Sequence, residues 1–78
     1  MRASARDAAL AMLARRPPDA TVCPSEVARA IAGPDMWRDA MPAVHAAVDA
    51  LLSERLIRLS WKGEELAERV GPYRIGRK

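Results

Sequence analysis

The fold is decided by the stretch Leu56-Ile57-Arg58-Leu59-Ser60-Trp61-Lys62, where the spacing of the apolar residues changes from a helical to an alternating pattern. Apolar side chains at Ile57, Leu59 and Trp61 alternate here with polar ones, which is typical of a strand with one buried face. Tyr73 and Ile75 alternate in the same way with their polar neighbours and predict a second strand. Glycines bound a connecting loop of roughly nine residues, so we expect a C-terminal β-hairpin.

A long amphipathic helix is predicted before this stretch, over Pro42–Arg55. One side of the helix carries apolar residues with a period of 3.6, and these are Val44, Ala47, Val48, Leu51 and Leu52. Proline suits the first helical position because it has no N–H group to leave unsatisfied. A separate short helical turn is expected over Met36–Ala40, capped by Asp35.

Two further helices are predicted nearer the N-terminus. The first covers Ala3–Arg16, with Ser4 as its N-cap, and it is stopped by two prolines. The second begins at Pro24 and ends before Gly33-Pro34, which is a common helix terminator. Between them, Thr21-Val22-Cys23 is β-prone and reads as a short extended segment.

This order of elements predicts an α+β, mainly helical fold, the winged helix-turn-helix, with three helices and a C-terminal β-hairpin wing. The chain has 78 residues, so we expect one domain over residues 1–78. Many of its hydrophobic residues are alanine, which leaves a thin core and no deep pocket for a small-molecule substrate. The predicted core consists of Leu10, Leu13, Val27, Ile31, Val44, Val48, Leu51, Ile57, Leu59 and Ile75.

Particular stretches of the chain also resemble a bacterial family of small winged-helix-like proteins whose function is not established. The resemblance is carried by Cys23-Pro24-Ser25-Glu26-Val27-Ala28, by Trp37 with Met41-Pro42-Ala43-Val44, and by Leu56-Ile57 with Lys62-Gly63. It covers nearly the whole chain. The resemblance implies the winged-helix fold and leaves the activity open.

Several classes of function are disfavoured by the sequence. It has no glycine-rich phosphate loop and no nucleophile within a known activation motif, so we expect no enzyme and no cofactor. A single cysteine, Cys23, and a single histidine, His45, cannot supply the four ligands of a structural zinc site. No stretch is apolar enough to span a membrane or to act as a signal peptide, which favours a cytoplasmic protein without a membrane partner.

The charge distribution favours double-stranded DNA as a partner. The net charge is +3, and basic residues gather near both ends of the chain. The residues expected to contact phosphates on the outer face of the hairpin are Arg58, Lys62 and Arg74, with Arg77 and Lys78 extending this surface. Such a surface would bind DNA through salt-dependent phosphate contacts, and the analogy with winged-helix regulators suggests a regulatory role.

The residues expected on the outer face of a recognition helix are His45, Ala46 and Asp49. They include an acid, and the helix predicted over Pro42–Arg55 has no positive charge in its first two turns. Recognition helices normally present arginine, lysine, asparagine or glutamine to the bases. This pattern favours contact with the DNA backbone over the reading of a sequence.

An alternative is a protein-interaction or homodimerisation module that binds no nucleic acid. Ala43, Ala46 and Ala50 would form a small, nearly uncharged surface that another helix could approach closely. Met12 and Met36, if exposed, would add an adaptable apolar contact.

Overall fold

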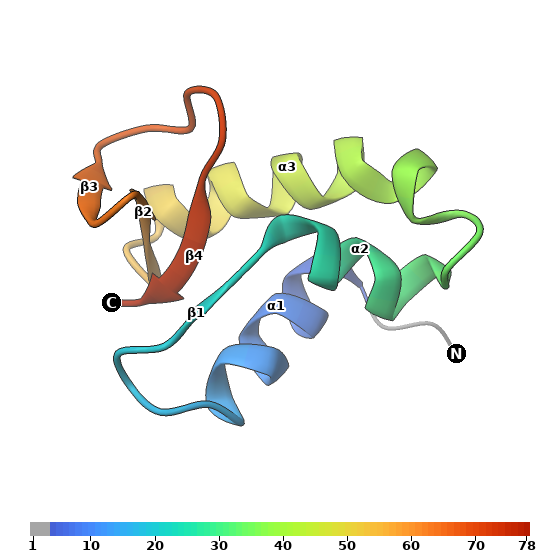
Figure 1. Cartoon of the computed structure of the whole chain (residues 1–78), viewed down its shortest axis with the longest axis horizontal. Helices are drawn as coiled ribbons and strands as arrows, with labels where there is room; N and C mark the ends of the chain where they lie inside the picture. Colours follow the sequence, from blue (N-terminus) through green and yellow to red (C-terminus); the bar gives the residue numbers. More distant parts are fainter. Residues whose placement is uncertain (1–3) are drawn as a thin grey trace.

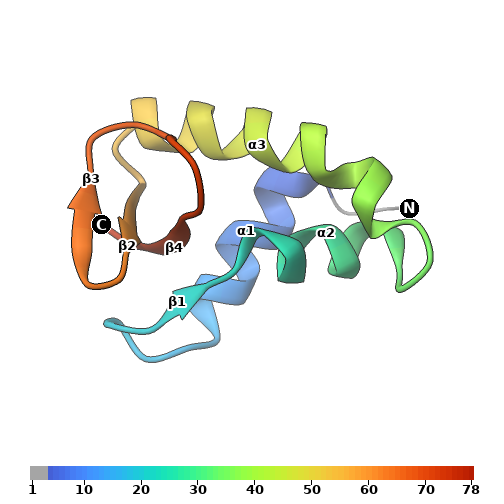
Figure 2. The same ribbon diagram turned by 45° about the horizontal axis from the view of Figure 1, so that its top comes forward.

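The computed structural model describes residues 4–78, which form three helices and a four-stranded antiparallel sheet. In chain order these elements are α1 (Ala5–Ala14), β1 (Thr21–Val22), α2 (Pro24–Ala32), α3 (Trp37–Ser53), β2 (Ile57–Trp61), β3 (Glu64–Leu66) and β4 (Arg74–Arg77). The long helix α3 crosses above α1 and α2, and the sheet lies toward its C-terminal end (Figures 1 and 2). The predicted α+β class is confirmed, while Ala3, the expected start of the first helix, lies outside the described residues.

The strand order in the sheet is β1-β4-β2-β3, so the strand that comes last in the sequence lies inside the sheet. Ile75 of β4 faces Val22 on one side and Leu59 on the other. A two-residue turn, Lys62-Gly63, joins β2 to β3, and both of its residues have positive φ, 51° and 83°. Such angles are typical of a type I′ turn, the tightest connection between two antiparallel strands.

The prediction of a plain loop between the two expected strands is wrong, because β3 forms within it. Leu66 of β3 pairs with Leu59 and is partly buried, whereas Glu64 and Glu65 are exposed. The main-chain hydrogen bonds of this short strand are made possible by the tight turn before it. A single apolar residue produces no alternating pattern, so the side chains of the segment did not reveal the strand.

The prediction that the third helix begins at Pro42 is also wrong. One continuous helix runs from Trp37 to Ser53 and contains the proline. Pro42 lacks the N–H group that would bind the carbonyl of Arg38, four residues earlier, and its ring crowds that carbonyl. Trp37, Ala40 and Met41 pack against the core, and this contact stabilises the turn before the proline.

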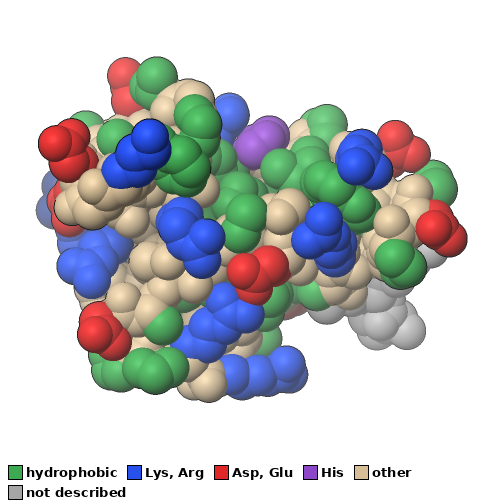
Figure 3. Space-filling view, viewed as in Figure 1, with side chains coloured by type: hydrophobic (Ala, Val, Ile, Leu, Met, Phe, Trp, Pro, Cys, Tyr) green, Lys and Arg blue, Asp and Glu red, His purple; other side chains and the backbone are tan. Residues whose placement is uncertain are grey.

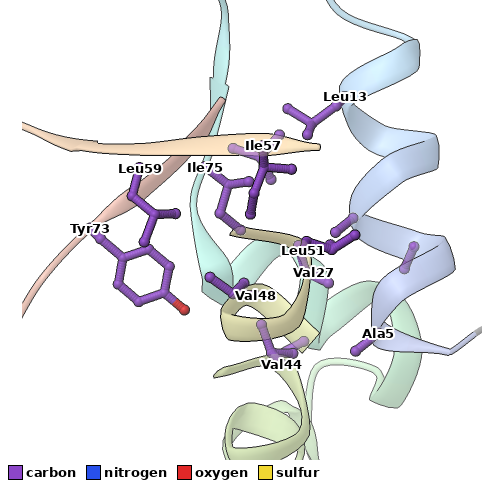
Figure 4. Packing of buried hydrophobic residues seen from close by; sticks show 14 residues of the cluster. Ala5, Leu13, Val27, Val44, Val48, Leu51, Ile57, Leu59, Tyr73 and Ile75 are labelled. Carbon is purple, nitrogen blue, oxygen red and sulfur yellow. The ribbon is translucent and has the colours of Figure 1, made fainter. Parts of the chain in front are cut away.

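The hydrophobic core lies between the helices and the inner face of the sheet (Figure 4). Its buried members include the predicted residues Leu13, Val27, Val44, Val48, Leu51, Ile57, Leu59 and Ile75. The other two predicted members, Leu10 and Ile31, are partly buried and pack against the cluster. Tyr73 joins it with 4% of its surface exposed. Trp61, expected on the buried face, is 38% exposed because it lies beside the turn at the end of β2.

Local signals near the N-terminus act as expected. Ser4 is the N-cap of α1, and its hydroxyl accepts a hydrogen bond from the Asp7 N–H at 3.0 Å. Pro24 is the first residue of α2, which ends at Ala32 and is followed by the C-cap Gly33 with a φ of 83°. Only glycine adopts this left-handed conformation without strain, so the residue fixes where α2 stops and the chain turns toward α3.

Candidate nucleic-acid interface

Two of the three residues expected on the recognition face of α3 are engaged by the segment between β3 and β4. The Nδ1 atom of His45 lies 2.7 Å from the hydroxyl of Tyr73, at hydrogen-bond distance. Arg69 donates two hydrogen bonds to the carboxylate of Asp49, at 2.9 and 3.1 Å. Ala46, between them on the helix, is exposed. The connection between the strands therefore folds back onto α3.

These contacts set the charges on the exposed side of α3. Burial lowers the pKa of His45, and the positive charge of Arg69 lowers it further, while Asp49 opposes the change. Burial raises the pKa of Tyr73 to about 12. The hydrogen bonds from Arg69 lower the pKa of Asp49, so this carboxylate is charged at neutral pH but has a cation beside it. The repulsion that Asp49 would exert on a phosphate is thereby reduced.

Two of the five predicted phosphate contacts use their donors within the protein. Arg77 lies on the same side of β4 as Ile75, and its guanidinium reaches the C-terminal end of α1. It donates to the carbonyls of Leu13, Ala14 and Arg16 at 3.3, 3.4 and 3.2 Å. Arg74 donates from Nε to the hydroxyl of Thr21 at 2.7 Å, which ties β4 to β1.

The other three predicted contacts, Arg58, Lys62 and Lys78, are exposed, and none of them forms an ion pair within residues 4–78. Arg58 and Lys78 line a shallow hollow of about 300 Å³ together with Arg55 and Glu65. We call Arg55, Arg58 and Lys78 the basic hollow. Arg55, expected as the last residue of the third helix, lies past the end of α3 at Ser53, with a φ of 62°, and it was not among the expected phosphate contacts.

Acidic residues border the basic hollow. Glu65 lines it, and Asp19 and Glu65 line a second hollow that also includes Arg58. The side chain of Arg58 packs over Gly76. A Cβ atom placed on this glycine would lie 3.5 Å from the Cγ atom of Arg58. Figure 3 shows blue side chains spread over the visible face of the molecule, with red ones among them. An anion bound here would meet separate cations rather than one strong positive field.

The first turn of α3 contains a cation that was not expected from the sequence pattern. The expectation of no positive charge in the first two turns depended on a helix beginning at Pro42, whereas the true start at Trp37 places Arg38 in the first turn. The guanidinium of Arg38 lies 4.4 Å from the centroid of the Trp37 ring, and that of Arg29 lies 4.6 Å from it. A helical wheel that began five residues earlier would have shown Arg38.

Within the described part of the chain, no helix is long and apolar enough to cross a membrane. The same residues contain no group of three or more His, Cys, Asp or Glu side chains placed to hold a metal ion. No curated protein matches the chain. A family model described as a protein of unknown function (DUF3253) matches residues 2–78, and the chain therefore belongs to this family.

Proposed function

We propose that this protein is a winged-helix module that binds duplex DNA through its phosphate backbone, with little preference for sequence. The winged-helix assignment is supported by two features. Helices α2 and α3 follow each other through a short turn, and β4 lies between β1 and β2. In this scheme β2, β3 and the segment up to β4 form the wing, which folds back onto α3.

The single observation that carries the proposal is the basic hollow. Arg55, Arg58 and Lys78 are exposed cations around one depression, and within residues 4–78 no carboxylate forms an ion pair with any of them. Lys62 adds a further exposed cation at the turn of the hairpin. Each phosphate that such a cation neutralises releases counterions from the duplex, which is the main source of non-specific affinity.

Contact with the backbone is favoured over base reading by the middle of α3. His45 and Asp49 already bind Tyr73 and Arg69, and the exposed residue between them is an alanine. Such a surface offers no bidentate partner for a base edge. The protein is thus proposed as a binding module, neither an enzyme nor dependent on a cofactor, with a cytoplasmic and regulatory role.

The test is a titration of two unrelated fluorescent duplexes with the protein, followed by anisotropy, at about 50 and 200 mM salt. The slope of log K against log salt is negative. Replacing Arg55, Arg58 or Lys78 with Gln should reduce its magnitude by about 0.9 for each phosphate that is no longer neutralised. The decrease should be equal for both duplexes. Arg15→Gln is the matched control, because Arg15 is an exposed arginine at the end of α1 that forms no ion pair within the described chain. If neither duplex binds at the lower salt concentration, the proposal is refuted.

A second candidate function is protein interaction through α3. Ala43, Ala46 and Ala50 are all exposed on this helix, and Met36, just before it, is 55% exposed. A self-associating chain would bury this apolar surface between copies. Sedimentation at tens of micromolar would then show a dimer that Ala46→Arg abolishes without unfolding the protein. A monomer under these conditions excludes the homodimer.

A further inference from the structure

A second group of exposed cations lies at the opposite end of α3 from the basic hollow. Arg29 belongs to α2 and Arg38 to the first turn of α3, and the turn between these helices brings both of them to the side chain of Trp37. Their guanidinium carbons are 4.6 and 4.4 Å from the centroid of that one ring. We call these three residues the Arg29–Arg38 cluster.

Within residues 4–78, no ion pair compensates the positive charges of this cluster. Elsewhere in residues 4–78, arginines do pair with acids: Arg6 with Glu54 at 2.7 Å, Arg16 with Glu26 at 2.6 Å and Arg69 with Asp49 at 2.9 Å. In the same described range, neither Arg29 nor Arg38 has a carboxylate within ion-pair distance. Because both guanidinium carbons lie close to the same ring centroid, they are at most about 9 Å apart, comparable to the Debye length of about 8 Å at physiological salt. A phosphate at this corner would be attracted by both.

The position of each guanidinium carbon over the Trp37 ring leaves the arginines able to bind such an anion. A guanidinium contacts an aromatic ring through its flat face, while its N–H donors point outward in its plane. Phosphate oxygens accept two of these parallel bonds from one arginine. The ring also restricts both side chains, so they have less conformational freedom to give up when they bind. Arg29 lies in the last turn of α2, where a cation also favours the helix dipole, and the experiment must separate that structural role from binding.

We propose that the Arg29–Arg38 cluster binds phosphates of the duplex backbone at the corner between α2 and α3. This inference rests on the proposed function and assigns it a second contact site. The helix α3 has 17 residues, and with a rise of 1.5 Å per residue it separates this cluster from the basic hollow by about 25 Å. The two sites therefore contact different phosphates, and their contributions to the salt dependence add.

The first measurement is the salt dependence of duplex binding for Arg29→Gln and Arg38→Gln, with Arg15→Gln as the matched control. Removal of one phosphate contact should lower the slope by about 0.9, so the fall in affinity over a fourfold rise in salt becomes about three- to four-fold smaller. Arg38→Lys keeps the charge but stacks less well, and it should retain the slope of the wild type. Thermal unfolding of each variant shows whether it is folded, and if one glutamine variant unfolds, the slope of the other still tests the proposal.

The second measurement follows Trp37 itself. The variant Trp61→Phe leaves Trp37 as the single tryptophan, since the chain has two. Its emission should change on addition of duplex with the same midpoint as the anisotropy signal, and Arg38→Gln should reduce this change. Unchanged slopes and unchanged emission, with duplex still bound, overturn the inference and leave the proposed function standing. Absence of any duplex binding at low salt refutes both.

Discussion

Replacing Arg77 with Gln should destabilise the protein without weakening its binding to DNA. The guanidinium of Arg77 donates to three carbonyls at the end of α1, those of Leu13, Ala14 and Arg16. The carbonyl of Leu13 also accepts from the Arg16 N–H at 3.2 Å, whereas those of Ala14 and Arg16 lie at the helix end, where carbonyls have no intrahelical partner. A hydrogen bond from a charged donor contributes about 1.5–3 kcal/mol when its geometry is good. These bonds are 3.2–3.4 Å long, beyond the usual 2.9 Å or so, and one nitrogen serves two of them. We therefore expect the free energy of unfolding to fall by about 1–2 kcal/mol in total.

For a domain of this size, such a change lowers the midpoint of thermal unfolding by about 5–15 °C. The measurement is urea and thermal unfolding followed by circular dichroism. Lys78→Gln is the control, because it removes the same charge from the next residue, which is exposed. Equal stability of the two variants would refute the reasoning. A salt slope lowered by Arg77→Gln as much as by Arg58→Gln would show that Arg77 leaves α1 to bind phosphate.

Three further predictions concern pH and the hairpin turn. Tyr73 is the only tyrosine, and its absorbance should show ionisation of the hydroxyl near pH 12 or when the protein unfolds. Because folding favours the protonated form, the free energy of unfolding should fall as the pH rises above 10. A titration midpoint near 10 in the folded protein would contradict this. Folding favours the neutral form of His45, so near and below about pH 6.5 the unfolded chain binds more protons than the folded one. The melting temperature should therefore fall as the pH drops through this value. His45→Gln should remove that part of the fall. Asparagine tolerates the positive φ of Lys62, so Lys62→Asn should raise the free energy of unfolding by up to about 1 kcal/mol while it weakens the salt dependence of duplex binding. Gly63→Ala should instead lower the free energy of unfolding by about 1–2 kcal/mol. Unfolding in urea checks both changes in stability.

The parts of the fold that could be predicted are those where one side of an element is buried. Alternation in β2 and β4 and the helical period of α3 follow from contact with the core, so the sequence shows them directly. The start of α3 could not be read in the same way. Pro42 locally favours a helix start, but the packing of Trp37 and Met41 against distant residues extends the helix past it. The strand β3 depends on main-chain hydrogen bonds, which leave no trace in the pattern of side chains.

The candidate site was less predictable because its residues act through partners far away in the sequence. Alternate residues of a strand point to the same side, so the sequence itself places Arg77 on the inner side of β4 with Tyr73 and Ile75. That its partners would be carbonyls of α1 depends on the assembled fold. The pairing of Asp49 with Arg69 likewise arises only when the segment before β4 folds onto α3. The charges of isolated elements therefore overstated how many cations are free to bind a phosphate.

The position of β4 inside the sheet has a consequence for how the protein is made. Residues 74–77 separate β1 from β2, so until the ribosome has released this segment β1 has no partner strand and β2 has only β3. The helices can form during synthesis, but the sheet and the anchoring of α1 must wait for the end of the described chain. Formation of the complete sheet is thus expected to be a late step that depends on contacts between distant parts of the sequence. A nascent chain stalled before residue 74 would expose the apolar surface that β4 covers, and would be a target for chaperones.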